Sequence, residues 1–176
     1  VLLDVNMPRL GGIEALTAAE IRRAGMVAAA VVISFDQRAV MRLRSLAPEI
    51  TRGRVYGRTS AEELLATARE AGCEIAMPHK SQIREPLVTR TREAGLKLAT
   101  WVVDEPAELV ARAAFGLYGV GSNRPGVLLD AIAPGDIPGI ASVIIDGHVR
   151  VGRSRNTALA RRLATFRGVS VGAGGH

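Results

Sequence analysis

Short apolar runs alternate with longer segments of helical periodicity along most of this chain. The apolar runs predict strands at residues 1–5, 30–34, 54–56, 74–77, 97–103 and 117–121. The intervening segments predict helices at residues 13–24, 37–47, 61–71, 85–94 and 106–115. Glycine, which ends a helix at little steric cost, follows four of these segments, at Gly25, Gly72, Gly95 and Gly116. Repeated units of this kind predict a parallel sheet covered by helices.

The strands predicted at 30–34 and 74–77 are apolar on both faces, as a sheet buried beneath helices requires. A TIM-type (β/α) barrel has about eight strand–helix units and about 250 residues. This chain has 176 residues and only about six units. We therefore expect an α/β fold, an incomplete TIM-type barrel of about six parallel strands with flanking helices, over residues 1–132. The start at Val1, with no initiator methionine, is expected to be a truncation point.

The alternation of strand-like and helix-like segments ends after residue 131. Apolar residues 142–145 and 148–151 flank Asp146-Gly147, a dipeptide typical of a type I′ hairpin turn. Residues 156–166 have helical spacing, with Asn156 as the expected N-cap. We expect residues 133–176 to form a C-terminal extension made of a loop, a β-hairpin and a helix.

Composition narrows the classes of function. The net charge is +6, but the arginines are spread along the chain and aromatic residues make up only 3%, which argues against nucleic-acid binding. A basic field attracts phosphate-bearing small molecules. The apolar runs are too short for a membrane span and no signal peptide is recognised, so a cytoplasmic location is expected. Cys73 is the single cysteine, and its apolar setting indicates a core residue and not a nucleophile.

Polar residues follow several of the predicted strands directly. They are Ser34-Phe35-Asp36, Trp101-Val102-Val103-Asp104 and Ser122-Asn123-Arg124-Pro125. A (β/α) barrel has its chemistry at the C-terminal ends of its strands. We therefore expect these segments to meet at one rim.

The order of these motifs between residues 25 and 129 resembles the glycerophosphodiester phosphodiesterase family. The resemblance lies in Val31-Val32-Ile33-Ser34-Phe35-Asp36, in Trp101-Val102-Val103-Asp104 after Gly95, and in the ending Ser122-Asn123-Arg124-Pro125. It implies a TIM barrel and a metal-dependent phosphoric diester hydrolase of lipid and glycerol metabolism. Such an enzyme converts glycerophosphodiesters to glycerol 3-phosphate and an alcohol.

The resemblance also implies roles for particular residues. Asp4 and Asn6 stand where the family has a metal-binding acid and a phosphate-binding lysine, so Asp4 is the candidate ligand for Ca²⁺ or Mg²⁺. Trp101 lines the pocket against the glycerol part of the substrate. Asn123 replaces the aspartate that the family has after its last strand. The family's catalytic histidines would precede Val1, so we assign no catalytic residue in this chain and expect the chain alone to be inactive.

Further candidates for substrate contact follow from position. Ser34 and Phe35 are expected to shape the pocket, because no base is adjacent in sequence to activate the serine. His79 and Lys80 follow the strand predicted at 74–77 and would project from the same rim. Lys80 would contact phosphate and partly replace the positive charge missing at Asn6.

Two alternatives stay open. Val1-Leu2-Leu3-Asp4-Val5-Asn6 also looks like the phosphoacceptor strand of a response-regulator receiver domain. The second alternative is a non-catalytic barrel relative that acts as a binding or assembly module. An unclosed sheet exposes backbone groups at its edges, so association into a homo-oligomer through those edges is expected.

Overall fold

The computed structural model describes residues 2–4, 12–124, 126–128 and 142–144. Seven parallel strands form one sheet whose spatial order is the chain order. They are β1 (Leu2–Asp4), β2 (Val31–Ser34), β3 (Thr51–Tyr56), β4 (Ile75–Pro78), β5 (Lys97–Thr100), β6 (Gly119–Gly121) and β7 (Ser142–Ile144). Each of these strands overlaps a segment for which the sequence predicted a strand, including β7 within residues 142–145.

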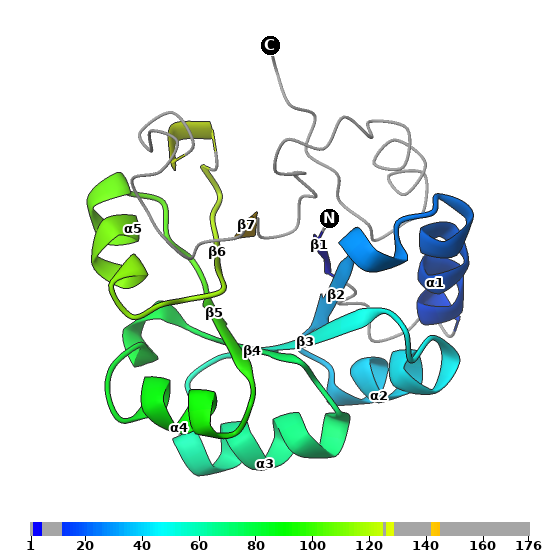
Figure 1. The fold of residues 1–176 in the computed structure, drawn as a ribbon, viewed down its shortest axis with the longest axis horizontal. Coiled ribbons are helices and arrows are strands. Elements are labelled where there is room, and N and C mark those ends of the chain that lie inside the picture. The colour runs from blue at the N-terminus through cyan, green and yellow to red at the C-terminus, as the bar shows by residue number, and fades with distance from the viewer. Residues whose placement is uncertain (1, 5–11, 125, 129–141, 145–176) are drawn as a thin grey trace.

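Five helices lie along the outer side of the curved sheet (Figure 1). They are α1 (Ile13–Arg23), α2 (Gln37–Leu46), α3 (Ala61–Ala71), α4 (Leu87–Glu93) and α5 (Pro106–Ala113), with short 3₁₀ turns at η1 (Val27–Ala29) and η2 (Lys80–Gln82). This arrangement confirms the incomplete TIM-type barrel. In the described part of the chain, no helix has the length and apolar character needed to cross a membrane.

The length of the sheet excludes the receiver alternative. A receiver domain is a doubly wound sheet of five strands and ends about two strand–helix units after its phosphoacceptor strand. Here six more strands of the same parallel sheet follow β1. The receiver interpretation of the first residues is therefore wrong.

Residues 142–145 were expected to form the first strand of a β-hairpin. In the structure Ser142–Ile144 form β7, which pairs in parallel with β6, with Ser142 opposite Gly119 and Ile144 opposite Gly121. The second hairpin strand predicted at 148–151 and the helix predicted at 156–166 lie outside the described residues. The first part of the predicted extension thus continues the barrel sheet.

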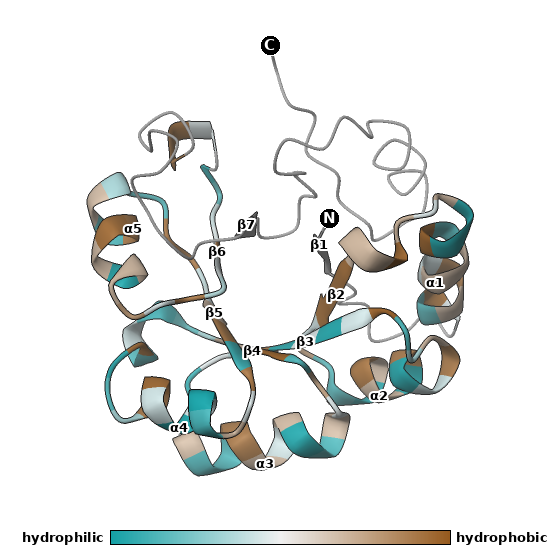
Figure 2. Cartoon of the chain, in the orientation of Figure 1, coloured by the Kyte–Doolittle hydropathy of each residue, from teal (hydrophilic) through white to brown (hydrophobic). Residues whose placement is uncertain are grey.

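The core has an inner and an outer layer. Ile33, Val55, Ile75, Met77 and Ala99 form the inner layer, and each is buried. The alternating positions of the strands pack against the helices, as Val32 does with Leu43 of α2. β2 is hydrophobic, whereas β3 has hydrophilic positions (Figure 2). The inner layer is completed at β3 by Gly53, where an added Cβ would lie 2.9 Å from the Ile33 Cγ2 atom.

Helix α3 shows how local sequence sets a boundary. The Ser60 hydroxyl accepts a hydrogen bond from the Glu63 N–H at 3.1 Å, as expected for an N-cap. The Glu63 carboxylate also reaches back beyond the N-cap and accepts from the Thr59 hydroxyl at 2.8 Å. The helix ends at Gly72, whose φ of 64° is left-handed.

Candidate active site

Parallel strands bring the predicted site residues to one rim of the sheet. Asp4 is the last residue of β1 and lies opposite Ile33, one residue before Ser34 at the end of β2. His79 and Lys80 follow β4, and Trp101 directly follows β5. The side chain of Asp4 and the whole of Asn6 lie outside what the structure describes.

An aromatic cluster forms at this rim from residues far apart in sequence. The Phe35 and Trp101 rings meet edge to face, with centroids 5.2 Å apart. The His79 ring meets Trp101 in the same way at 5.3 Å. Trp101 is anchored by its indole N–H, which donates to the Tyr56 carbonyl at 3.1 Å. Perpendicular rings of this kind form a rigid, partly exposed wall.

The His79 ring is oriented by its own loop. Its Nδ1 atom lies 2.9 Å from the Ser81 hydroxyl and accepts from the Ser81 N–H at 3.3 Å. Because Nδ1 accepts from this N–H, the neutral ring has its proton on Nε2. His79 thus offers an N–H donor from Nε2.

Ser34 is placed differently from the aromatic residues. Its side chain is buried and lines a small gap beside Val40 and Leu43 of α2. Its hydroxyl accepts from the Asp36 N–H at 3.0 Å, and Asp36 in turn caps α2. This position favours a structural role at the end of β2.

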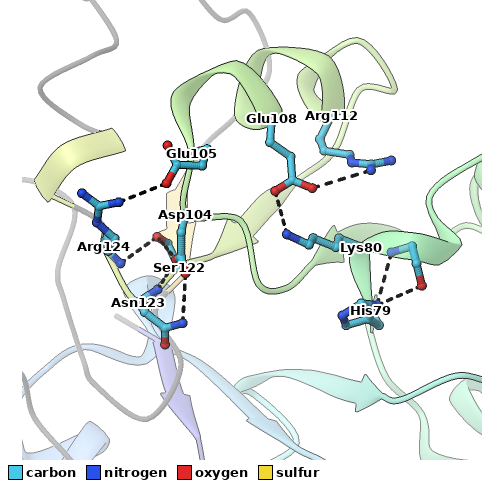
Figure 3. A network of polar contacts seen from close by, with 10 residues as sticks. His79, Lys80, Asp104, Glu105, Glu108, Arg112, Ser122, Asn123 and Arg124 are labelled. Atoms are coloured by element: carbon cyan, nitrogen blue, oxygen red, sulfur yellow. Dashed lines mark hydrogen bonds and ion pairs between the residues drawn. The ribbon is translucent and has the colours of Figure 1, made fainter.

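Lys80 extends toward α5 (Figure 3). Its ammonium donates to the Glu108 carboxylate at 2.7 Å, and Arg112 lies 3.7 Å from the other oxygen of that carboxylate. Glu108 therefore offsets the charge that Lys80 would present to a phosphate. This pairing could not be predicted from the sequence, because the two residues are 28 positions apart.

A second polar cluster joins the ends of β5 and β6 through Asp104. One carboxylate oxygen accepts from the Ser122 hydroxyl at 2.9 Å and from the Asn123 N–H at 2.7 Å. The other accepts from the Asn123 side-chain amide at 3.1 Å. Partial burial acts to raise the pKa of Asp104, but these hydrogen bonds outweigh it and lower the pKa below its usual range. Asp104 therefore stays ionised at neutral pH.

The described residues do not supply a full set of metal ligands. Among them, no group of three or more His, Cys, Asp or Glu side chains lies close enough to hold an ion. Both oxygens of Asp104 are already used by hydrogen bonds. The expected Ca²⁺ or Mg²⁺ site at Asp4 stays a prediction, since the Asp4 side chain lies outside what the structure describes.

Cys73 lies in the turn between α3 and β4 and is buried, which supports its assignment as a core residue. Burial, with a further contribution from Glu74, raises the pKa of the thiol to about 11. We expect the native thiol to react with Ellman's reagent at pH 7.5 about a hundredfold more slowly than the unfolded chain in urea. Equal rates in the two states would contradict this assignment.

Comparison with known proteins places these residues in context. The glycerophosphoryl diester phosphodiesterase family matches residues 5–127, more than half of the chain. A search of curated proteins gave no match. Among solved structures, a Silicibacter pomeroyi protein assigned as a glycerophosphoryl diester phosphodiesterase is 26% identical, with a TM-score of 0.59, over 67% of this chain and 44% of its own.

Two further solved structures share the fold. A glycerophosphodiester phosphodiesterase from Agrobacterium tumefaciens is 23% identical, with a TM-score of 0.59, over 74% of this chain and 55% of its own. An Oleispira antarctica phosphodiesterase in complex with the product sn-glycerol 3-phosphate is 20% identical, with a TM-score of 0.56, over 73% of this chain and 53% of its own. The chain thus spans about half the length of these solved relatives.

Proposed function

Since the chain belongs to the glycerophosphoryl diester phosphodiesterase family, we propose that it takes part in hydrolysing glycerophosphodiesters to glycerol 3-phosphate and an alcohol. The observation that carries the proposal is the family match over residues 5–127. That match includes the rim residues from Phe35 to Asn123, which lie at the strand ends where such barrels bind substrate.

The aromatic cluster supports a place for the glycerol part of the substrate. Phe35 and Trp101 offer apolar ring edges to the carbon skeleton, and His79 offers a hydrogen-bond donor beside them. Lys80 would contribute to phosphate binding only to the extent that Glu108 leaves its charge available. We propose that Phe35, His79 and Trp101 form one wall of the substrate site.

The chemistry itself needs groups beyond this wall. By family resemblance, one histidine protonates the leaving alcohol and another acts as base or nucleophile. The resemblance implies that both stand on strands before Val1, and the histidine of the described rim is His79. We therefore expect the 176-residue chain, assayed by itself, to bind the product without hydrolysing the diester. A non-catalytic binding module is the second candidate, favoured because Glu108 offsets the Lys80 charge that would stabilise the reacting phosphoryl group.

The proposed wall of Phe35, His79 and Trp101 can be tested by measuring ligand binding. Replacing Phe35 with alanine removes one of the three rings of the aromatic cluster. We expect the affinity for sn-glycerol 3-phosphate, measured by calorimetry, to fall about tenfold. Phe115→Ala is the matched control, because Phe115 packs against the cluster that includes Leu109 and Leu117. It should leave the affinity unchanged.

Either of two results would contradict the proposal. One is the lack of saturable binding of sn-glycerol 3-phosphate by the unaltered chain. The other is an equal loss of affinity in the Phe35 and Phe115 variants. Release of glycerol 3-phosphate from glycerophosphoethanolamine, assayed with Ca²⁺ or Mg²⁺, then separates the enzyme from the binding module.

A further inference from the structure

We infer that Asp104 is a positioning residue that turns the carbonyl oxygen of Asn123 toward the substrate, as an acceptor for a hydroxyl of its glycerol part. The inference rests on the proposed function and deepens it. It assigns a role in substrate recognition to one atom, Asn123 Oδ1, and it explains why that atom is oriented as it is.

The orientation follows from the ionised state of Asp104. A carboxylate can only accept hydrogen bonds, so the group that faces it from Asn123 must be the NH₂ of the amide. That contact is made at 3.1 Å between Asn123 Nδ2 and the second carboxylate oxygen. The amide is planar, so Oδ1 is directed away from Asp104, as Figure 3 shows.

The rest of the cluster keeps Asn123 from turning. The Asn123 N–H donates to the first oxygen of Asp104 at 2.7 Å, so one residue is tied at both its backbone and its side chain. Ser122 is fully buried, and its hydroxyl donates to Asp104 while accepting from the Arg124 N–H at 2.9 Å. The loop after β6 is therefore fixed before any ligand arrives, which lowers the entropic cost of binding.

The exposed acceptor selects one part of the proposed ligand. Asn123 is exposed, and within the described ranges its Oδ1 accepts no hydrogen bond. A phosphate dianion has only acceptor oxygens and gains nothing from a carbonyl oxygen, whereas a glycerol hydroxyl can donate to it. Asn123 should therefore discriminate between ligands by their hydroxyls.

The experiment compares two ligands on the 176-residue chain by calorimetry. They are sn-glycerol 3-phosphate and n-propyl phosphate, which has the same phosphate and carbon skeleton but lacks the hydroxyls. We expect the unaltered chain to prefer sn-glycerol 3-phosphate by at least about tenfold, the typical effect of one good hydrogen bond. Asn123→Leu should reduce this preference about tenfold by removing the acceptor.

Asp104→Asn tests the positioning itself. The asparagine introduced at position 104 can donate to Asn123 Oδ1, so the Asn123 side chain is free to turn its amide over. The preference for sn-glycerol 3-phosphate should then also be reduced, while the affinity for n-propyl phosphate stays the same. The matched control is Glu105→Gln, which weakens only the neighbouring contact of Glu105 with Arg124, 3.0 Å long. It should keep the full preference.

The outcomes separate this inference from the proposed function. If the unaltered chain binds neither ligand, the proposed function fails and the inference fails with it. If it binds both ligands equally well, or if the Asp104 and Asn123 variants keep the full preference, the inference is overturned while the proposed function stands.

Discussion

Replacing Arg52 with methionine should lower the free energy of unfolding by about 3 kcal/mol, because the substitution leaves buried main-chain acceptors without a donor. Arg52 lies in β3 and is only 5% exposed. Its Nη1 atom donates to the carbonyl of Pro48 at 3.0 Å and to that of Ile50 at 2.8 Å. The guanidinium also reaches the Glu74 carboxylate, which accepts from the Arg52 N–H at 2.7 Å as well.

The two loops that Arg52 joins explain the size of the effect. One leads from α2 into β3 and the other from α3 into β4, so one side chain links two strand–helix units. Glu74 is 42% exposed and can be hydrated after the substitution, so we assign most of the loss to the carbonyls. Urea denaturation followed by circular dichroism measures the change.

Two further variants test the assignment. Arg38→Met removes an arginine whose side chain is 81% exposed and should change stability by no more than about 0.5 kcal/mol. Arg52→Lys keeps the charge but lacks the forked donor, and it should still lose most of the stabilisation. If Arg52→Lys or Arg52→Met unfolds at the same urea concentration as the unaltered chain, the proposed role is wrong.

Introducing valine at Gly53 should lower the free energy of unfolding by about 2–3 kcal/mol through overpacking of the inner layer. A Cβ at this position would lie 2.9 Å from Ile33 Cγ2 and 3.3 Å from Ile75 Cβ, both on strands that flank β3. These neighbours are buried and cannot swing into solvent. The thermal unfolding midpoint gives a second measurement of the same loss.

Gly57→Val is the matched control for Gly53→Val. An added Cβ at Gly57 meets nothing within 4 Å, so this variant should be nearly neutral. In an Ile33→Ala background, which removes the nearest atom, the cost of Gly53→Val should be smaller. An equal cost in both backgrounds would show that the inner layer does not set the constraint.

Most of the fold could be predicted from the sequence because its units are local. The predicted helix at 37–47 is α2 with one residue added, and the predicted strand at 117–121 contains β6. The start of β3 was missed, since a strand was predicted only at 54–56 and β3 begins at Thr51, with Arg52 buried in the sheet. A buried arginine that bonds to main-chain carbonyls leaves no sequence signal, because every residue has a carbonyl.

The rim was predictable in outline and not in detail. Strand-end positions brought Phe35, His79 and Trp101 together as expected for a parallel sheet. Ser34 turned toward the helices because successive residues of a strand face opposite sides. The pairing of Lys80 with Glu108 depends on how α5 packs over the loop after β4, which periodicity alone does not specify.

The identical order of strands in space and in sequence bears on how the chain is synthesised. Each strand from β2 to β6 pairs only with the strands immediately before and after it in the chain. A nascent polypeptide leaving the ribosome can therefore dock each new strand on the preceding one without waiting for a distant partner. The sheet can then grow by addition of strands at one edge. Each new strand pairs with one that is near in sequence, so the chain segment between them is short.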